Sequence, residues 1–229
     1  DITAFADRLK PLDSLVFLGI STHPGHVYAC RGPEELSQYT EDESRAIGTA
    51  VKNLTAAGYS LKIVSTGSTP TFEGEACMES VNILHPGVYV FNDCMQHAIG
   101  GTPYDRCALY MYTTIISNPK PGLYICDAGS KCFGLDRGAH GNTLVAGHGY
   151  IKGHDELELF SLSEEVGKIR IKTGMNSDIR VGDRLEIIPN HACSAANLTG
   201  YYFFAEGEEI TGAVKNEMRS NSTLKNYSA

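Results

Sequence analysis

The turn at residues 65–71, Ser-Thr-Gly-Ser-Thr-Pro-Thr, directly follows the apolar run at residues 61–64. A strand that ends in small residues is a common phosphate site in α/β proteins, because successive main-chain N–H groups there form an anion-binding concavity. The hydroxyls of Ser68 and Thr69 add donors, and a side chain at Gly67 would obstruct the ligand. The same letters also occur in ordinary turns. The turn therefore indicates a phosphate site only in combination with other motifs.

The composition is that of an ordinary globular protein. The chain has 229 residues, of which 42% are hydrophobic, so it can build a buried core as one large domain or two small ones. Its 27 acidic and 19 basic residues give a net charge of -8, which argues against nucleic acid or an anionic membrane as partner and favours a small-molecule ligand. No apolar stretch approaches the roughly eighteen residues of a membrane span, and the N-terminus lacks the organisation of a signal peptide.

The seven cysteines are an odd number without CxxC pairing, which predicts reduced thiols and a cytoplasmic protein. Secretion is the alternative, because four N-x-[ST] sequons occur at Asn53, Asn197, Asn221 and Asn226. The chain begins at Asp1, and residues 1–9 have the pattern of an amphipathic helix. We interpret this start as a processed or truncated end.

Predicted strands alternate with helices over residues 1–103. The strands are expected at residues 15–21, 61–65 and 81–84, and the helices at residues 40–57 and 73–79. A capping-box pattern at residues 40–43 starts the longer helix, and Gly58 ends it. Such alternation implies a parallel sheet, in which ligands bind at the carboxyl ends of the strands. The segments at residues 22–28, 65–71 and 85–93 all fall at such ends.

After residue 103 the pattern becomes that of an all-β domain over residues 104–218, with a polar tail at residues 219–229. Short β-branched or aromatic runs predict strands at residues 108–117, 123–127, 143–151, 157–160, 168–171, 184–188 and 201–204. Residues 179–185 are interpreted as one strand turning into another. The strands of residues 1–103 are too few to close a barrel, and open edges need a cover. We therefore expect a missing N-terminal segment or a second chain to complete it, and interpret the sequence as a C-terminal piece.

His191 and Cys193 are the candidate metal ligands, because they follow a predicted strand that ends in a turn. Ligands at positions i and i+2 of an extended backbone point to the same side and can reach one zinc ion. A buried cysteine beside a hydrogen-bonded histidine is the structural alternative. Other candidates, each with a structural alternative, are His23, His26 and Tyr28 at a strand end, Tyr89 with Asp93 as its support, Asp127 in a turn, and Glu164 with Glu165 in a solvated hairpin.

Six motifs extend through nearly the whole chain. They are T-H-x-G-H-x-Y at residues 22–28, S-x-G-S-T-P-T at 65–71, H-P-G-x-Y-x-F-x-D at 85–93, D-A-G-x-K at 127–131, S-E-E-x-G at 163–167 and P-N-H-x-C at 189–193. Because it contains these six motifs in this order, the chain resembles the D-serine dehydratase and D-threonine aldolase family of fold type III pyridoxal-phosphate enzymes. That family is distantly related to alanine racemase. The resemblance implies the C-terminal portion of a (β/α)8 barrel followed by an antiparallel β domain.

The resemblance also implies the roles of individual residues. Those implied in binding the cofactor are Tyr28, Thr66, Gly67, Ser68, Thr69 and Tyr89, of which Gly67, Ser68 and Thr69 hold its phosphate. His191 and Cys193 are implied as ligands of a divalent metal. A thiolate at the second position suits zinc, as in the D-serine dehydratases, whereas the aldolases have a harder oxygen ligand there.

The function implied by this resemblance is a zinc- and pyridoxal-phosphate-dependent D-serine dehydratase, which converts D-serine to pyruvate and ammonia. In that chemistry the pyridine ring takes up electrons from Cα, and zinc acts on the β-hydroxyl as a Lewis acid. A D-threonine aldolase, or another D-3-hydroxy amino acid lyase, is the alternative among enzymes. The family is expected to pair the barrel of one subunit with the β domain of a second, so the complete protein is expected to be a homodimer.

Two departures from the family pattern affect this interpretation. No lysine in the chain matches the setting of the family's Schiff-base lysine, so no catalytic residue is assigned and the chain alone is expected to be inactive. Val166 stands where the family usually has a histidine in S-E-E-H-G. Both departures favour a different class of function, a non-catalytic pseudoenzyme that retains a cofactor or metal site as a binding module.

Overall fold

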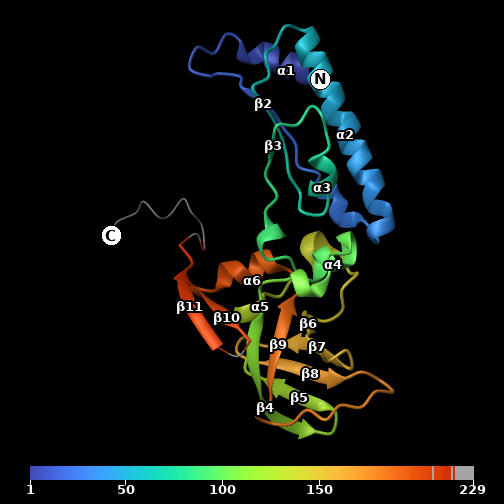
Figure 1. Cartoon of the computed structure of the whole chain (residues 1–229), viewed down its shortest axis with the longest axis vertical. Coiled ribbons are helices and arrows are strands. Elements are labelled where there is room, and N and C mark those ends of the chain that lie inside the picture. The colour runs from blue at the N-terminus through green and yellow to red at the C-terminus, as the bar shows by residue number, and fades with distance from the viewer. Residues whose placement is uncertain (208, 218, 220–229) are drawn as a thin grey trace. The chain divides into compact units, whose positions relative to one another are not determined.

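The computed structural model describes residues 1–207, 209–217 and 219 (Figure 1). Residues 220–229 of the predicted tail, with the sequons at Asn221 and Asn226, lie outside the described residues. The chain divides into two compact units. The first comprises residues 1–90 and 98–101, and the second comprises residues 91–97 and the chain from residue 102 onward. All seven cysteines are free thiols.

The first unit contains a parallel sheet with the order β1-β2-β3, formed by β1 (Gly19–Ser21), β2 (Ile63–Thr66) and β3 (Ile83–Leu84). Ser21 pairs with Ser65, and Ser65 pairs with Ile83, so the carboxyl ends of the three strands are level. The predicted parallel α/β organisation of this part is confirmed. The first strand is shorter than predicted, because residues 15–18 lie outside β1.

The longest helix, α2 (Pro33–Ala56), runs alongside this sheet (Figure 1). Its predicted start at residue 40 is wrong: Thr40 lies inside the helix, where its hydroxyl donates to the Leu36 carbonyl at 3.1 Å. Gly32 precedes the helix and Pro33 occupies its first turn, where a fixed φ and a missing N–H cost nothing. The other helices are α1 (Ile2–Leu9), α3 (Phe72–Glu75) and α4 (Cys94–Gly100), and the short 3-10 helices are η1 (Gly25–Ala29) and η2 (Val88–Val90).

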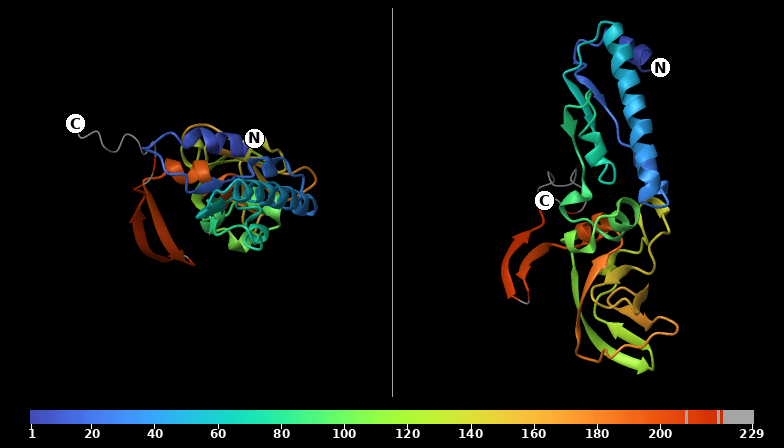
Figure 2. Two further views of the ribbon diagram at one scale, coloured as in Figure 1. Left: turned by 90° about the horizontal axis from the view of Figure 1, so that it is seen from above. Right: turned by 45° about the vertical axis from the view of Figure 1, so that its right-hand side comes forward.

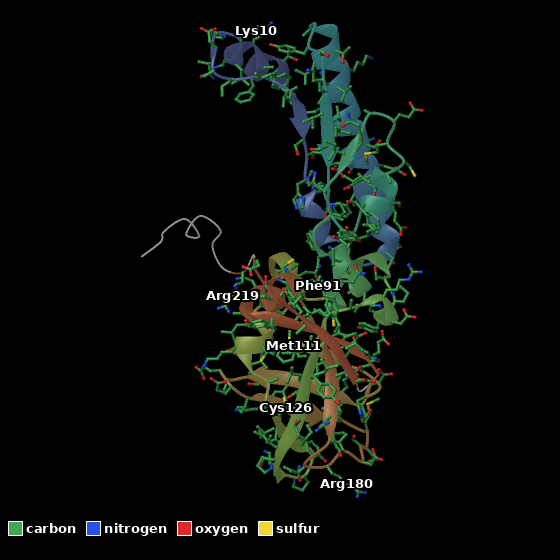
Figure 3. The ribbon with its side chains drawn as sticks, turned by 60° about the vertical axis from the view of Figure 1, so that its left-hand side comes forward. Lys10, Phe91, Met111, Cys126, Arg180 and Arg219 are labelled. Atoms are coloured by element: carbon green, nitrogen blue, oxygen red, sulfur yellow. The ribbon has the colours of Figure 1, made fainter. Side chains whose placement is uncertain are left out.

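The second unit is built on a six-stranded antiparallel sheet with the order β6-β9-β4-β5-β8-β7, which confirms the predicted all-β character (Figure 2). Its strands are β4 (Met111–Lys120), β5 (Leu123–Cys126), β6 (Gly149–Ile151), β7 (Leu157–Leu162), β8 (Gly167–Ile171) and β9 (Arg184–Pro189). Figure 3 marks Met111, where β4 begins, and Cys126, where β5 ends. Ile115, Leu159, Ile169 and Ile187 are fully buried in the core of this sheet.

The second unit departs from the predicted strands in three places. The strand predicted at residues 143–151 is present only as β6, and residues 143–148 lie outside it. Residues 179–183 form a turn instead of a strand, in which the Asp183 carboxylate accepts from the Arg180 amide at 2.7 Å. A further strand, β11 (Glu209–Lys215), pairs with β10 (Tyr201–Glu206) as a separate two-stranded hairpin. The unit also contains α5 (Ser130–Phe133), α6 (Ala192–Leu198) and the 3-10 helices η3 (Tyr104–Arg106) and η4 (Ala139–Gly141).

Among the described residues, no helix combines the length and the apolar character that crossing a lipid bilayer requires.

Candidate functional site

The small-residue turn after β2 is closely packed against the segment after β3. A Cβ atom added at Gly67 would lie 2.5 Å from the main-chain carbonyl carbon of His85 and 2.6 Å from its carbonyl oxygen. Backbone cannot give way as a flexible side chain can, so this position admits only glycine. The imidazole of His23 contacts the carbonyl oxygen of Gly67 through Nδ1. The turn is therefore held by histidines that follow β1 and β3.

The donors at the centre of this turn, in residues 67–69, have no partners within the described part of the chain. Ser68 is 1% exposed, and neither its hydroxyl nor that of Thr69 forms a hydrogen bond there. The main-chain N–H groups of Gly67, Ser68 and Thr69 likewise find no main-chain acceptor in that part. Buried donors without partners are costly, so several of them at one turn indicate a place for an anion. The turn fits a phosphate group by this criterion.

The other residues predicted for cofactor binding follow the ends of neighbouring strands. Tyr28 lies in η1, which follows β1, and Tyr89 lies in η2, which follows β3. Tyr89 is half-exposed, and its ring centroid is 6.3 Å from that of Phe72. Thr66 is buried, and its hydroxyl donates to the Glu43 carboxylate at 2.5 Å, so its hydroxyl proton is already engaged within the chain. Glu43 was missed by the sequence analysis.

In the second unit, His191 and Cys193 meet by a different geometry from the one predicted. His191 is extended, with φ -135° and ψ 101°, but it is the N-cap of α6, so Cys193 lies in the first helical turn. The argument from an extended i, i+2 backbone is therefore wrong. The two side chains are nevertheless within hydrogen-bonding reach of each other, and Cys193 is exposed.

Asp136 is a further member of this cluster that the sequence did not reveal. One of its carboxylate oxygens contacts Nδ1 of His191, and the other accepts from the Ser194 hydroxyl at 2.8 Å. Hydrogen bonding to Cys193, and then to Asp136, raises the pKa of His191 to about 9, against the opposing effect of burial. A histidine that engages a carboxylate through one nitrogen is oriented to present the other to a metal ion. Asp136 is distant in sequence and lies in no motif, so no signal pointed to it.

Asp93 forms a hydrogen bond with the segment that carries His191 and Cys193. Its carboxylate accepts from the main-chain amide of Ala192 at 2.8 Å and from that of Gln96 at 2.9 Å. Asp93 is fully buried, which raises its pKa, although these hydrogen bonds oppose the shift. Asp93 is predicted from sequence to support Tyr89, whereas its hydrogen bond to Ala192 holds the main chain between His191 and Cys193.

Asn190 forms hydrogen bonds that hold the loop next to this cluster. Its side-chain amide donates to the carbonyl oxygens of Arg137 at 2.8 Å and of Gly147 at 3.0 Å. Arg137 directly follows Asp136, so these bonds fix the loop that carries the Asp136 carboxylate. The P-N-H-x-C motif therefore contains the candidate ligands His191 and Cys193. It also contains Asn190, which fixes the loop that carries Asp136.

The remaining motifs have structural roles in the second unit. The carbonyl oxygens of Ser163 and Glu164 accept from the amides of Ser130, at 2.8 Å, and Lys131, at 3.2 Å. The D-A-G-x-K and S-E-E-x-G motifs thus pair with each other. Glu164 and Glu165 are exposed between β7 and β8, in agreement with the solvated-hairpin interpretation.

Asp127 also fixes local structure. Its Oδ1 atom accepts from the Thr113 hydroxyl at 2.6 Å and from the Thr114 amide at 2.8 Å, and these bonds lower its pKa. The turn interpretation of Asp127 accounts for both contacts.

Metal binding by this chain alone would be incomplete. No group of three or more His, Cys, Asp or Glu side chains in the described ranges is arranged to hold a metal ion. His191 and Cys193 together supply two ligands, an imidazole and a thiol, and zinc in proteins usually takes four. A catalytic zinc site leaves positions for water or substrate, so the donor pair fits part of such a site.

Comparison with known proteins supports a common origin for these features. Residues 108–205 match the family described as "Putative serine dehydratase domain". The chain is 31% identical over 211 residues to a D-serine dehydratase of Dictyostelium discoideum, an alignment that covers 87% of this chain and 53% of that protein. The chain spans about half the length of the curated relatives it matches.

Two solved structures share the fold. The D-threo-3-hydroxyaspartate dehydratase of Delftia sp. HT23 has a TM-score of 0.73 and 31% identity over 81% of this chain and 52% of that one. An alanine racemase-like protein of Idiomarina loihiensis has a TM-score of 0.77 and 30% identity over 88% of this chain and 55% of that one. Variants of the Delftia enzyme have alanine in place of a histidine or, in the metal-free form, of a cysteine two positions later.

The neighbours are barrel enzymes, and the parallel strands and helices of the first unit, followed by the antiparallel sheet, correspond to the C-terminal portion of such a (β/α)8 barrel and its β domain. In sequence and fold the chain is therefore similar to the D-serine dehydratase and D-threonine aldolase family, and its residues 108–205 match the serine dehydratase domain.

Proposed function

We propose that this chain is part of a pyridoxal-phosphate- and zinc-dependent dehydratase that acts on D-serine or a related D-3-hydroxy amino acid. The observation that carries the proposal is the turn at residues 67–69, where buried hydroxyls and amides have no partners among the described residues. A phosphate group would satisfy these donors together. The relatives named above supply the reaction class.

The first unit would bind the cofactor. Gly67, Ser68 and Thr69 hold its phosphate through main-chain N–H groups and the two hydroxyls, and Tyr28 and Tyr89 contact its ring. Pyridoxal phosphate supplies the electron sink for reactions at Cα when it is bound. The work of this chain is to fix the phosphate and so to orient the ring, and His23 keeps the carbonyl of Gly67 turned to the imidazole, away from the anion.

The second unit would bind the metal ion. His191 presents the nitrogen that does not contact Asp136, and Cys193 presents its sulfur. A zinc ion supplies a Lewis acid for the departure of a hydroxyl group. The soft thiol favours zinc over harder divalent cations, which supports elimination over the aldolase alternative. The metal-free cysteine variant of the Delftia dehydratase supports a metal-binding role for the corresponding position here.

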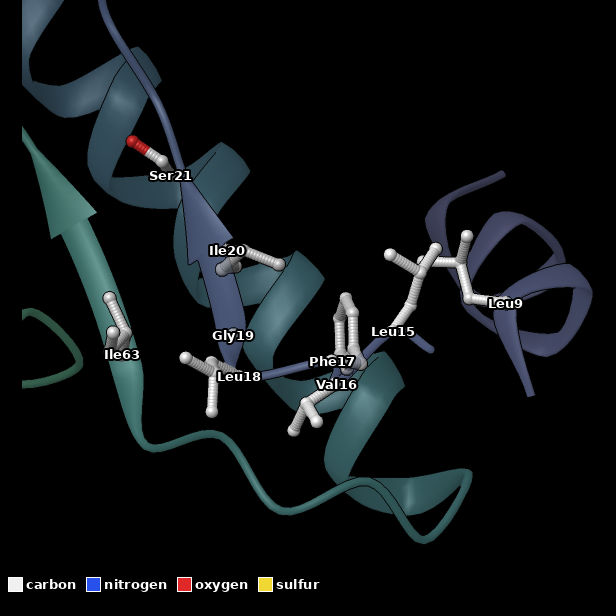
Figure 4. A pocket seen from close by; sticks show the side chains of 9 residues that line it. All are labelled: Leu9, Leu15, Val16, Phe17, Leu18, Gly19, Ile20, Ser21 and Ile63. Atoms are coloured by element: carbon white, nitrogen blue, oxygen red, sulfur yellow. The ribbon is translucent and has the colours of Figure 1, made fainter. Parts of the chain in front are cut away.

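The lysine that binds the cofactor would come from outside these 229 residues, either from the barrel half that the relatives possess or from a second chain. An apolar groove of ≈ 350 Å³ beside β1 supports this arrangement (Figure 4). Leu15, Val16 and Leu18 line it and are exposed, and within the described sheet β1 pairs with β2 alone. A neighbouring strand would cover both the groove and the open edge. We propose that the completed protein is a homodimer.

A pseudoenzyme remains the alternative class of function, and Val166 is the residue that favours it. Its carbonyl oxygen accepts from the Ser163 amide at 2.8 Å in the turn between β7 and β8. That contact involves only the main chain, so the turn forms with valine as well as with histidine. The fold of the hairpin therefore does not depend on the residue that the family usually has, whereas a contact to substrate would.

The test is to treat the native sample with borohydride, which fixes lysine-bound cofactor covalently, and to measure intact masses under denaturing conditions. A second, lysine-bearing chain with a pyridoxyl adduct supports the proposal. An untreated portion of the same sample should then release ammonia and pyruvate from D-serine, because reduction by borohydride inactivates the cofactor. This activity should be lost on chelation and in Cys193→Ala. With D-threonine, 2-oxobutanoate and ammonia indicate a dehydratase, whereas glycine and acetaldehyde indicate an aldolase. Recovery of the unmodified chain alone, without such activity, supports the pseudoenzyme.

A further inference from the structure

Two helices of the first unit each place a glutamate in the interior next to the candidate phosphate turn. Glu43 lies in α2 and is 4% exposed, and Glu75 lies in α3 and is 0% exposed. Buried carboxylates are rare unless a cation or a set of donors compensates the charge. Here the two carboxyl groups lie within hydrogen-bonding reach of each other. Neither belongs to a motif that the family resemblance used.

Each of these carboxyl groups holds one end of the turn. The Thr66 hydroxyl donates to Oε1 of Glu43 at 2.5 Å, and the Thr71 hydroxyl donates to Oε1 of Glu75 at 2.5 Å. Thr66 is the last residue of β2, and Thr71 is the N-cap of α3, so the pair brackets residues 67–70. The distance between the two carboxyls is thereby coupled to the spacing of the two ends of the turn.

The carboxyl oxygens that do not contact the threonines indicate a proton between Glu43 and Glu75. Oε2 of Glu43 and Oε2 of Glu75 are both buried, and neither has a donor among the described residues. Two ionised carboxylates only accept hydrogen bonds and repel each other, whereas one shared proton turns one of them into a donor. Burial, reinforced by Glu75, raises the pKa of Glu43 to about 7, although the Thr66 and Thr22 hydroxyls oppose the shift.

We propose that Glu43 and Glu75 share one proton and act as positioning residues, whose closed carboxyl pair sets the shape of the anion-binding turn between Thr66 and Thr71. This proposal rests on the proposed function in taking that turn as the phosphate site. Loss of the shared proton leaves two like charges in contact, which separates the pair, moves the ends of the turn apart and weakens anion binding. The pair thereby makes cofactor retention sensitive to pH.

Other ionisable groups contact the turn and have to be separated from the pair. His23 contacts the carbonyl oxygen of Gly67, and the His85 ring and main chain pack against Gly67. Because both histidines lie against the same turn, their effect on anion binding has to be measured apart from that of the pair. Around the carboxyl of Glu43 itself stand Glu75 from α3, Thr66 from β2 and Thr22 from the segment after β1. A glutamine variant of the pair separates the effect of the shared proton from that of the histidines.

The first measurement is carbon NMR of the side-chain carboxyls of the ligand-free chain, selectively labelled at glutamate, from pH 5 to pH 9. We expect one buried carboxyl to keep its proton to about pH 7, with shifts of the Gly67 and Ser68 amide signals that follow the same titration. The carboxyl titration should disappear in Glu43→Gln. Glu73→Gln, at an exposed position of the helix α3 that carries Glu75, is the control and should leave the carboxyl titration in place. Two buried carboxyls that are both ionised at pH 5 would overturn the proposal.

The second measurement is the affinity for sulfate, a dianion whose charge does not change over this pH range. For the natural chain we expect the affinity to fall about tenfold or more between pH 6 and pH 8.5. Glu43→Gln carries a permanent donor, so its affinity should stay high across the range. A pH dependence that is the same in Glu43→Gln and in the natural chain overturns the proposal, because the effect would then arise outside the pair. Absence of sulfate binding at every pH, with the carboxyl and amide titrations intact, instead removes the proposed phosphate site and leaves the shared proton standing.

Discussion

The carboxylate of Asp93 accepts a 2.8 Å hydrogen bond from the main-chain amide of Ala192, although the two residues are far apart in the sequence. Ala192 lies between the two candidate metal ligands, so this single contact ties the start of α6 to the start of α4. A charged acceptor that serves two main-chain donors is worth more than a neutral one. The consequence is that Asp93 governs the placement of His191 and Cys193 without contacting a ligand.

We expect Asp93→Asn to lower the free energy of unfolding by about 1–3 kcal/mol, because the asparagine NH2 group faces a main-chain N–H in place of an acceptor. Urea unfolding of the metal-free chain measures this change. Asp105→Asn is the control, since Asp105 is exposed, and it should change the unfolding free energy little. Equal stabilities of the two variants would contradict a supporting role for Asp93.

The stability of the metal-free chain should depend on pH through His191. The pKa of His191 is raised to about 9 from its ordinary value of 6.5, so protonation stabilises the folded state. This contribution is complete below about pH 6.5 and is lost as the pH rises through 9. Asp136→Asn removes one cause of the shift. It should therefore destabilise the chain more at pH 6 than at pH 10, as measured by urea unfolding with a chelator present. A loss that is equal at the two pH values would show that Asp136 acts only through packing.

Zinc binding should show the opposite pH dependence. Zinc competes with the proton on His191, so the apparent affinity should rise between pH 6 and pH 9. Titration with a competing chromophoric chelator measures it. Ser194→Ala removes one hydrogen bond to Asp136 while it keeps both ligands, and we expect only a modest loss of affinity. A loss as large as that of His191→Ala would mean that Ser194 itself is a ligand.

Gly67→Ala should abolish anion binding at the turn and lower stability by about 1–3 kcal/mol, because the new methyl group overlaps the main chain of His85. Sulfate titration and thermal unfolding measure the two effects. Gly87→Ala is the matched control: a Cβ at Gly87 meets no atom within 4 Å, so that variant should bind and unfold like the natural chain. If both variants kept sulfate binding, the turn would not be the anion site.

His191→Ala should lose zinc and keep the cofactor, because the two candidate sites are each held within one compact unit. Zinc content by atomic emission and the absorbance of the bound cofactor measure the two groups separately in the completed enzyme. Glu164→Gln, at an exposed hairpin position, serves as the control and should keep both. Simultaneous loss of metal and cofactor would contradict the separate assignments.

The parallel and antiparallel parts of the fold could be predicted from sequence because both follow from local periodicity. Runs of β-branched residues between turn formers locate most strands of the second unit, and the spacing of Ile47, Val51 and Leu54 reveals α2. The start of α2 could not be located in this way. The residues at 40–43 have the letters of a capping box, but Pro33 begins the helix earlier and Thr40 bonds to the preceding turn.

The candidate site could be predicted only where its members lie in one short segment. Gly67, Ser68 and Thr69 are consecutive, and His191 and Cys193 are two positions apart, so motifs in the sequence point to all five residues. Asp136, Glu43 and Glu75 reach their partners through tertiary structure, and nothing about their sequence neighbours distinguishes them from surface carboxylates. Burial is the property that separates the two glutamates from the rest, and burial of a charged residue is what sequence patterns predict least well.

The junction between the D-A-G-x-K and S-E-E-x-G motifs restricts which residues can occupy two positions of these motifs. A Cβ at Gly129 would lie 2.4 Å from the carbonyl oxygens of Ser163 and Glu164, and one at Gly167 would lie 2.7 Å from that of Ala128. Both glycines are thus required by the architecture of the β domain, whatever the chain binds. A protein without catalytic activity would still need both glycines to form this fold. Surveys that count such signatures as proof of catalysis would therefore include inactive descendants of the family.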